Sequence, residues 1–223
     1  MHVAEAIASR RSIRDFLATP VPPDVIRRVL AGASRAPSGG NLQPWHIDVV
    51  AGEPLERLKA TMRERVLEAP GGEPTEYDIY PEGLVSPYRE RRFAVGEQMY
   101  ALMGIPREDK PARLRWLTRN YQAFGAPMVL FCSVDRRLGR PQWSDLGMFL
   151  QSVMLLLRAE GLDSCAQEAW SRYHETVDRF LGQPPERMLF CGMAVGYRNP
   201  EHPVNQLVAE RAPLEAFVRF HGA

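Results

Sequence analysis

The hydrophobic positions of this chain repeat with two different periods, which predicts a domain of the α+β class. Apolar residues recur every three or four positions in several segments, as they do on the buried face of a helix. These segments predict helices at 3–9, 22–35, 53–68, 110–124, 143–160 and 173–181, and another that runs through residue 103. Short apolar runs rich in branched side chains predict strands at 45–50, 128–134 and 188–197.

Three segments lack either period. Residues 36–45 (APSGGNLQPW) form a fixed turn between a helix and a strand, because glycine accepts positive φ and proline restricts the backbone. Taken alone, such a cluster fits an ordinary connection as well as a loop that approaches a flat ligand. Residues 69–92 include a long Pro- and Gly-rich connection, which predicts a lid-like insertion. The tail at 203–223 carries apolar residues without a clear period, so we expect it to lie on a partner subunit.

Composition narrows the class of protein. The chain has 223 residues and a formal net charge of +1, which gives no electrostatic reason to expect nucleic acid or an anionic membrane as a partner. Its start lacks the apolar core of a signal peptide, and no apolar run approaches the length of a bilayer span, so we expect a cytoplasmic protein. The three cysteines show no C-x-x-C spacing, so we predict no disulfide and no metal site, with Cys132 and Cys191 in the core.

One short segment is suited to an anion. Arg10, Arg11, Ser12 and Arg14 place three guanidinium groups and a hydroxyl within five positions. Arginine binds phosphate through a planar fork of donors, and serine adds a short donor. By itself, the same triplet also fits a solvated basic turn.

The two motifs together resemble the nitroreductase family of FMN flavoenzymes. The sequence RRSIRDF at 10–16 is followed at the family's spacing by APSGGNLQPW at 36–45, and residues 161–168 (GLDSCAQE) match a third family motif. Relatives often carry proline and glycine near the third motif, where this chain has Ala166 and Ala169. The resemblance covers the whole chain as one domain, 1–223.

The resemblance implies a set of cofactor contacts. Residues matching Arg10, Arg11 and Ser12 hold the FMN phosphate and ribityl chain, and one matching Arg14 reaches the pyrimidine edge of the flavin. The loop at Pro37–Asn41 would lie against flavin bound mainly by the other subunit. The implied cofactor-binding residues are Arg10, Arg11, Ser12, Arg14, Pro37, Ser38, Gly39, Gly40, Asn41, Asn120, Cys165, Ala166, Gln167, Glu168 and Arg211.

Substrate contacts are expected from the lid-like insertion and its neighbours. The candidates are Tyr77, Tyr80, Tyr88, Arg89 and Phe124, which suit an aromatic substrate with or without a carboxylate. Residues 88–92 fit equally well the solvated first turn of a helix. We assign no catalytic side chain. Glu168 would be a general acid on one interpretation, but we favour a role in orienting the cofactor, because protons can come from water.

The resemblance also implies fold and function. The expected fold is a mixed β-sheet flanked by helices, in an intertwined homodimer whose C-terminal tails are exchanged. The expected activity passes a hydride from NAD(P)H through FMN to a nitroaromatic, quinone or similar small acceptor by a ping-pong mechanism. Dehalogenation of an aromatic, reduction of an activated alkene, and a flavin-binding module without turnover remain as alternatives. No G-x-G-x-x-G fingerprint is present, so a nicotinamide donor would visit the flavin only transiently.

Overall fold

Four antiparallel strands form one sheet in the computed structural model, which describes residues 1–222. The strands are β1 (His46–Ala51), β2 (Met128–Asp135), β3 (Asp163–Gln167) and β4 (Arg187–Gly196), in the order β1-β2-β4-β3. The α+β class is confirmed, but all three strand pairs are antiparallel rather than mixed. Parallel pairing is limited, within the described residues, to the single bridge between Ser12 and Ser164.

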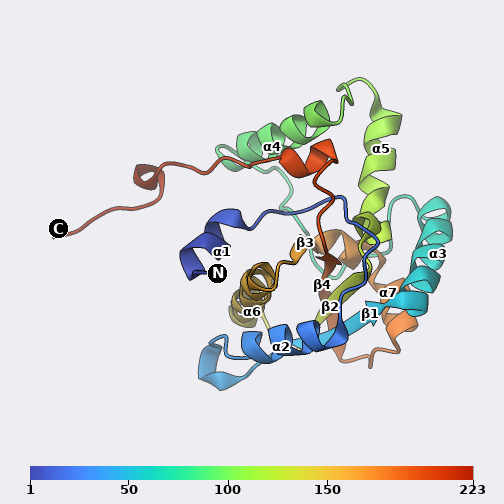
Figure 1. Cartoon of the computed structure of the whole chain (residues 1–223), viewed down its shortest axis with the longest axis horizontal. Helices are drawn as coiled ribbons and strands as arrows, with labels where there is room; N and C mark the ends of the chain where they lie inside the picture. The colour runs from blue at the N-terminus through green and yellow to red at the C-terminus, as the bar shows by residue number, and fades with distance from the viewer. Residues whose placement is uncertain (223) are drawn as a thin grey trace.

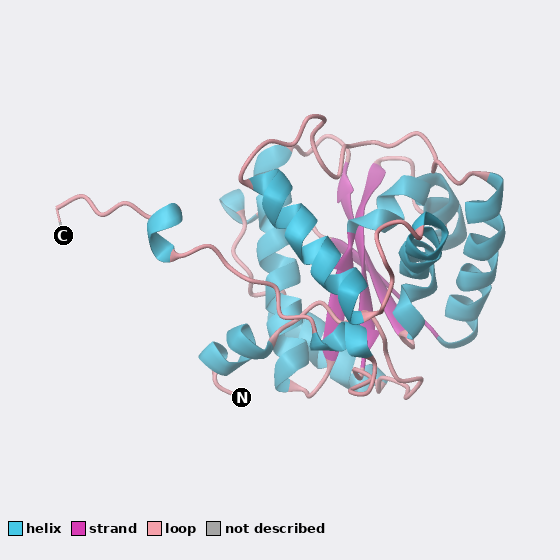
Figure 2. Cartoon of the chain, turned by 90° about the horizontal axis from the view of Figure 1, so that it is seen from above, coloured by secondary structure: helices cyan, strands magenta, loops and turns pink. Residues whose placement is uncertain are grey.

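Two groups of helices cover the two faces of this sheet, which lies between them in Figure 2. Alternate residues of β2 point to opposite faces, so Val129 and Phe131 join one core while Leu130 and Cys132 join the other. The helices, shown in Figure 1, are α1 (Val3–Ser9), α2 (Pro23–Ala33), α3 (Gly52–Glu68), α4 (Tyr88–Leu102), α5 (Lys110–Thr118), α6 (Arg140–Ala159) and α7 (His174–Leu181). Helix α3 packs in the first core with α7, and helices α2 and α6 pack in the second.

The two central strands explain the long apolar runs of the sequence. Seven of the eight residues of β2 are buried, as expected of a strand covered on both faces. Cys132 and Cys191 are free, buried and paired across β2 and β4, so their predicted place in the core is confirmed. Burial raises the pKa of the Cys132 thiol to about 12.

One predicted helix is wrong over its second half. Helix α5 ends at Thr118, and residues 119–125 form a 3-10 segment (Arg119–Gly125) instead of continuing to Phe124. Ala123 and Phe124 have φ of +50° and +53°, values that stop a helix. Tertiary hydrogen bonding accompanies this reversal, because the Phe16 N–H donates to the Phe124 carbonyl at 3.2 Å. The helix period could not reveal it.

The segment after α3 is fastened to the start of α7. The Tyr173 hydroxyl donates to the Ala69 carbonyl at 2.8 Å, and the Glu73 N–H donates to the Arg172 carbonyl at 2.7 Å. The Glu73 side chain is only 1% exposed and accepts from the Thr176 N–H at 3.2 Å. The predicted lid-like insertion is therefore tied firmly to the body of the domain at its first turn.

The tail leaves the body of the domain and ends far from it (Figures 1 and 2). A short 3-10 turn at Pro203–Gln206 still packs on the domain, with Val204 1% exposed. Further on, Phe217 and Phe220 are 69% and 70% exposed. Within residues 1–222, none of the helices is long and apolar enough to cross a membrane.

Candidate functional site

The arginine motif runs as an extended segment directly after α1. Ile13 is fully buried, and its N–H donates to the Ser164 carbonyl of β3 at 3.1 Å. The Arg14 N–H donates to Oδ1 of Asn205, near the start of the tail, at 2.9 Å. Because neighbouring side chains of an extended segment point to opposite sides, fixing Ile13 inward turns Ser12 and Arg14 the other way.

The polar residues of the arginine motif line a cavity of about 360 Å³. Arg10, Arg11, Ser12 and Arg14 are joined there by Arg211 from the tail of the same chain. None of the described lining residues is acidic. Four guanidinium groups and a hydroxyl thus surround one cavity, and these are the donor types that suit a phosphate or similar anion. The three arginines of the motif are partly buried rather than fully solvated.

A second cavity of about 700 Å³ adjoins the first through Arg14, which lines both. Part of its wall is formed by Ala166 and Gln167 at the end of β3 and by Glu168 directly after it. Asn120 lies beside them, since Gln167 Nε2 donates to the Asn120 carbonyl at 2.8 Å. The Trp170 indole donates to Gln167 Oε1 at 3.3 Å, so this wall is held by hydrogen bonds on both sides.

The carboxyl group of Glu168 belongs to a residue that lines this cavity. Desolvation raises its pKa above the ordinary value for glutamate, although solvent still reaches the residue. Cys165, expected among the cofactor contacts, is only 3% exposed and belongs to the core instead. Alternation along β3 explains the difference, because Cys165 and Ala166 point to opposite faces of the strand.

The glycine-rich turn lies elsewhere in the chain. Gly40 and Asn41 both have φ of +56°, as the predicted positive-φ turn requires, although residues Gly39–Asn41 form a 3-10 turn where no helix was expected. The Gly39 N–H lies 3.3 Å from both carboxylate oxygens of Asp145 on α6. Residues 37–41 line neither cavity of their own chain. Their contact with flavin in the partner subunit stays a prediction.

The five candidate substrate residues separate into three groups. Tyr80 lines the larger cavity, with the Arg92 guanidinium 4.1 Å from the centre of its ring. Tyr88 and Arg89 are exposed at the start of α4, outside both cavities, and Arg89 pairs with Glu90 at 2.7 Å.

Tyr77 and Phe124 are corrected by the structure. The Tyr77 ring packs against Trp143, and its hydroxyl donates to the Phe190 carbonyl. Burial raises the Tyr77 pKa well above its usual range. Phe124 is 2% exposed and packs near Trp116 in the core. Neither side chain lines either of the two cavities described above, because both fill apolar space in the cores.

Several residues of the larger cavity were not expected from the sequence. They are Val66, Leu67, Pro70, Ile79, Arg92, Leu114, Arg115, Leu117, Thr118, Tyr121, Ala169, Arg172 and Tyr173. The spacing of Leu114, Leu117 and Tyr121 puts them on one side of α5 and its 3-10 extension, and this shared side is visible in the sequence. It could not distinguish a core-facing side from one that faces a cavity.

An arginine-lined anion cavity that opens beside a larger, partly apolar cavity is the arrangement that a phosphorylated ligand with a flat ring requires. The family model of the nitroreductases matches residues 7–197, so the chain belongs to the nitroreductase family and the resemblance of its motifs is confirmed. A curated relative, nitrobenzene nitroreductase of Ectopseudomonas oleovorans, is 36% identical over 218 residues, covering 98% of this chain and 96% of the relative.

Two solved structures share the whole fold. The FMN- and NADPH-dependent nitroreductase NfnB of Sphigopyxis sp. strain HMH is 45% identical, with a TM-score of 0.97 and full coverage of both chains. The FMN-dependent nitroreductase NfnB of Mycobacterium smegmatis, solved in complex with NADPH, is 32% identical. Its TM-score is 0.92, with coverage of 98% of this chain and 97% of that one.

Proposed function

We propose that this protein is an FMN-dependent oxidoreductase that uses NAD(P)H to reduce a nitroaromatic, quinone or similar small electrophilic acceptor. The observation that carries the proposal is the junction at Arg14 between the anion cavity and the larger cavity. FMN has a dianionic phosphate at one end and a flat ring at the other, so it needs such a pair of adjoining cavities. The family and the names of its relatives support the same cofactor and donor.

The side chains of this protein would bind and orient the cofactor. Arg10, Arg11 and Arg211 would hold the phosphate, with Ser12 as an additional donor. Arg14 would reach the pyrimidine edge of the ring, where a positive charge favours the reduced form. When bound, FMN supplies the chemistry of hydride acceptance and donation. Donor and acceptor would then use the larger cavity in turn, which is a ping-pong mechanism.

The Ala166–Glu168 wall and Asn120 would position the ring. Glu168 would orient the cofactor rather than transfer a proton, because water can reach the cavity and supply it. Tyr80 and Arg92 line the same cavity and offer an aromatic face and a positive charge to an aromatic acceptor. Tyr88 and Arg89 lie outside both cavities of their own chain, so we infer that they contact substrate only if they reach the cavity of a partner subunit.

The site would be shared within a homodimer. The exposed apolar tail and the separation of Pro37–Asn41 from the cavities of their own chain both support a partner that completes the site. Replacing Gly40 with valine, which disfavours φ of +56°, tests this. The variant should bind FMN more weakly while its far-ultraviolet circular dichroism stays unchanged. Unaltered FMN affinity would argue against a shared site.

The cofactor assignment is tested on purified protein. The native protein should show a flavin absorbance spectrum, bleach with NADPH or NADH, and recover its colour when a nitroaromatic is added. Arg10→Ala should raise the dissociation constant for FMN roughly ten- to a hundredfold, because a hydrogen bond to a charged group contributes about 1.5–3 kcal/mol. Arg27→Ala removes an exposed arginine of α2 and serves as the control. A protein that binds no FMN would refute the proposal.

The acceptor class is a separate question. Turnover on a panel of nitro, halogenated and enone compounds distinguishes nitro reduction from dehalogenation and from alkene reduction. A nitro compound left unchanged, while another class is reduced, would favour one of these alternatives. Bleaching without any reoxidation by an acceptor would instead indicate a flavin-binding module.

A further inference from the structure

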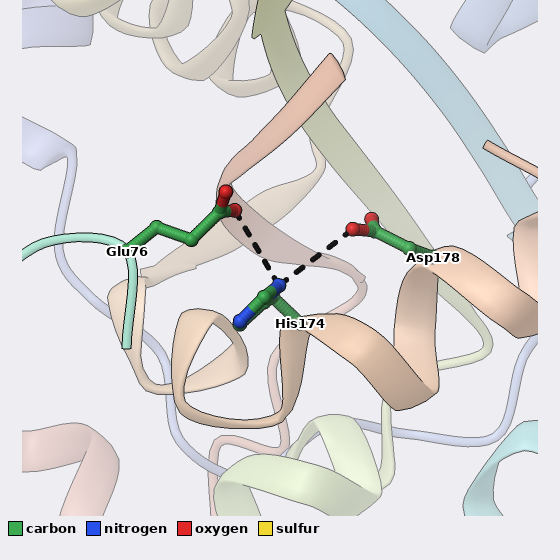
Figure 3. A group of neighbouring side chains, drawn as sticks. All are labelled: Glu76, His174 and Asp178. Atoms are coloured by element: carbon green, nitrogen blue, oxygen red, sulfur yellow. Dashed lines mark ion pairs between the residues drawn. The ribbon is translucent and has the colours of Figure 1, made fainter. Parts of the chain in front are cut away.

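A histidine and two carboxylates meet where the segment after α3 reaches α7, and none of the three lines either of the two cavities. Glu76 comes from the segment after α3, while His174 and Asp178 lie one turn apart on α7, where a spacing of four residues puts them on one face. Their ligand atoms all lie within 4.8 Å of one another (Figure 3). We call these three residues the His174 cluster.

The hydrogen bonding of His174 determines what its ring presents to the cluster. Nε2 lies 2.8 Å from the Pro74 carbonyl oxygen. Because a carbonyl oxygen can only accept, Nε2 carries a proton and donates it. In the neutral ring Nδ1 then presents a lone pair, which points toward the two carboxylates. This nitrogen is buried and has no hydrogen-bond partner among residues 1–222, in a residue that is 9% exposed.

A lone pair that faces two carboxylates is repelled unless something positive lies between them. A proton on Nδ1 would normally draw a carboxylate oxygen to about 2.7–2.9 Å. The distances are longer, at 3.4 Å to Glu76 Oε2 and 3.8 Å to Asp178 Oδ2. The second Asp178 oxygen, Oδ1, is also buried without a partner among the described residues.

These distances suit a metal ion. Zinc binds histidine nitrogen and carboxylate oxygen at about 2.0–2.2 Å, so two ligands of a tetrahedral ion lie about 3.4 Å apart. The Nδ1 to Glu76 distance has this value, and the Asp178 oxygen is slightly farther. The side chains of His174, Asp178 and Glu76 are 11%, 18% and 21% exposed, so the cluster is enclosed but accessible to a small ion.

Arg136 is a positively charged side chain beside the cluster, and it pairs closely with only one of the two carboxylates. Its Nε donates to Glu76 Oε1 at 2.7 Å, which turns Oε2 of the same carboxylate toward His174. Its Nη2 remains 3.8 Å from Asp178 Oδ2. A second layer of hydrogen bonds of this kind, including the bond from Nε2 to Pro74, is what orients metal ligands in known sites. One guanidinium against two carboxylates leaves a negative balance for a divalent ion to offset.

We propose that Glu76, His174 and Asp178 bind one divalent transition-metal ion, for which zinc is the best match in ligand type. The fourth ligand is water. The ion fastens the segment after α3 to α7, a few residues before Ile79 and Tyr80 enter the wall of the larger cavity. Its role is to hold that wall, so it is a structural ion that takes no part in electron transfer. The sequence contained the signal His-x-x-x-Asp at 174–178, but the residue that completes the site lies about a hundred positions earlier.

Zinc titration of the full-length protein tests the proposal. Protein purified with its cofactor is treated with a chelator, desalted, and titrated with zinc sulfate in a calorimeter. Wild type should bind one equivalent, and Glu76→Gln and Asp178→Asn should each weaken binding at least tenfold. Glu175→Gln removes an exposed carboxylate from the same helix and should bind as wild type does. Zinc should raise the unfolding temperature of wild type and of Glu175→Gln, but not of the two cluster variants.

Glu76→Gln and Asp178→Asn keep the shape of the side chain, and Glu76 lies outside the helices and strands, so both variants should fold. Circular dichroism without zinc checks that they do. X-ray absorption of the zinc-loaded protein should show nitrogen and oxygen ligands and no sulfur. Absence of zinc binding, equal binding by wild type and both variants, or sulfur ligation would each overturn the proposal. None of these measurements depends on the identity of the flavin or the acceptor.

Discussion

Asp163 is the buried charge on which the position of β3 depends, and Asp163→Asn tests how much it contributes. The side chain is 3% exposed at the first residue of β3. Oδ1 accepts from Arg158 Nη1 at 2.9 Å and from Arg198 Nη2 at 2.7 Å. Oδ2 accepts from Arg198 Nε at 2.7 Å. One carboxylate thus joins the end of α6, the start of β3 and the second residue after β4.

The size of the effect follows from this geometry. Asparagine has the same shape but only one accepting oxygen, so its NH2 group must face a guanidinium donor. Breaking a buried ion pair costs about 3–5 kcal/mol when the remaining charge stays unsolvated. The Arg158 and Arg198 side chains are 14% and 30% exposed, which lets water compensate part of the loss. We expect Asp163→Asn to lower the free energy of unfolding by about 3 kcal/mol, at the lower end of that range.

Urea denaturation at neutral pH and one fixed protein concentration measures this loss as a lower midpoint with an unchanged slope. Glu160→Gln is the control, because Glu160 pairs with Arg28 near the same end of α6, where the Arg28 and Glu160 side chains are 60% and 34% exposed. A surface pair of this kind contributes at most about 1 kcal/mol. A loss below 1 kcal/mol for Asp163→Asn, or an equal loss for the control, would refute the reasoning.

Two further changes test the packing around the site. Burial alone would raise the pKa of Glu73, but hydrogen bonds from Thr176 and Arg65 lower it below the ordinary value, so this carboxylate stabilises the fold at neutral pH. This stabilisation is lost as pH falls through the lowered pKa of Glu73. Glu73→Gln should therefore be less stable than wild type in urea denaturation at pH 7, and the difference in the free energy of unfolding should narrow below about pH 4. A difference that does not change with pH would contradict this explanation. An added Cβ at Gly192 would lie 2.3 Å from Cδ1 of the fully buried Trp170, so Gly192→Ala should cost about 1–3 kcal/mol in thermal unfolding, and an unchanged midpoint would show that the indole can move.

Local sequence determined most of the secondary structure. The helix and strand periods placed the segments that became α1, α2, α3, α6 and α7 and the strands β1, β2 and β4, with shifts of a few residues at the ends. These elements have strong apolar periods and ordinary boundaries, such as Gly161 with φ of +77° after α6. Strand β3 was recognised only as part of a motif, because Asp163–Gln167 is a short segment with mostly polar residues.

The order of the motifs along the chain also identified the family before any tertiary contact was known. Arginine clusters and glycine-rich turns are local features, and their chemistry does not depend on distant residues. Because these features are local, the sequence could not show which of two nearby similar side chains faces a cavity. Tyr77 and Tyr80 are three residues apart, yet one packs against Trp143 and the other lines the larger cavity.

What the sequence by itself determined is therefore most of the helices and strands, the basic motif from Arg10 to Arg14, and the family. The tertiary structure alone decided which distant groups meet: Arg211 joins the arginine motif, and Glu76 joins His174 and Asp178. It also decided that the chain reverses at Phe124 instead of continuing as a helix. The physical reason is that periodicity and propensity report on neighbours within a few residues, whereas cavities and charge clusters arise from packing between segments a hundred or more positions apart.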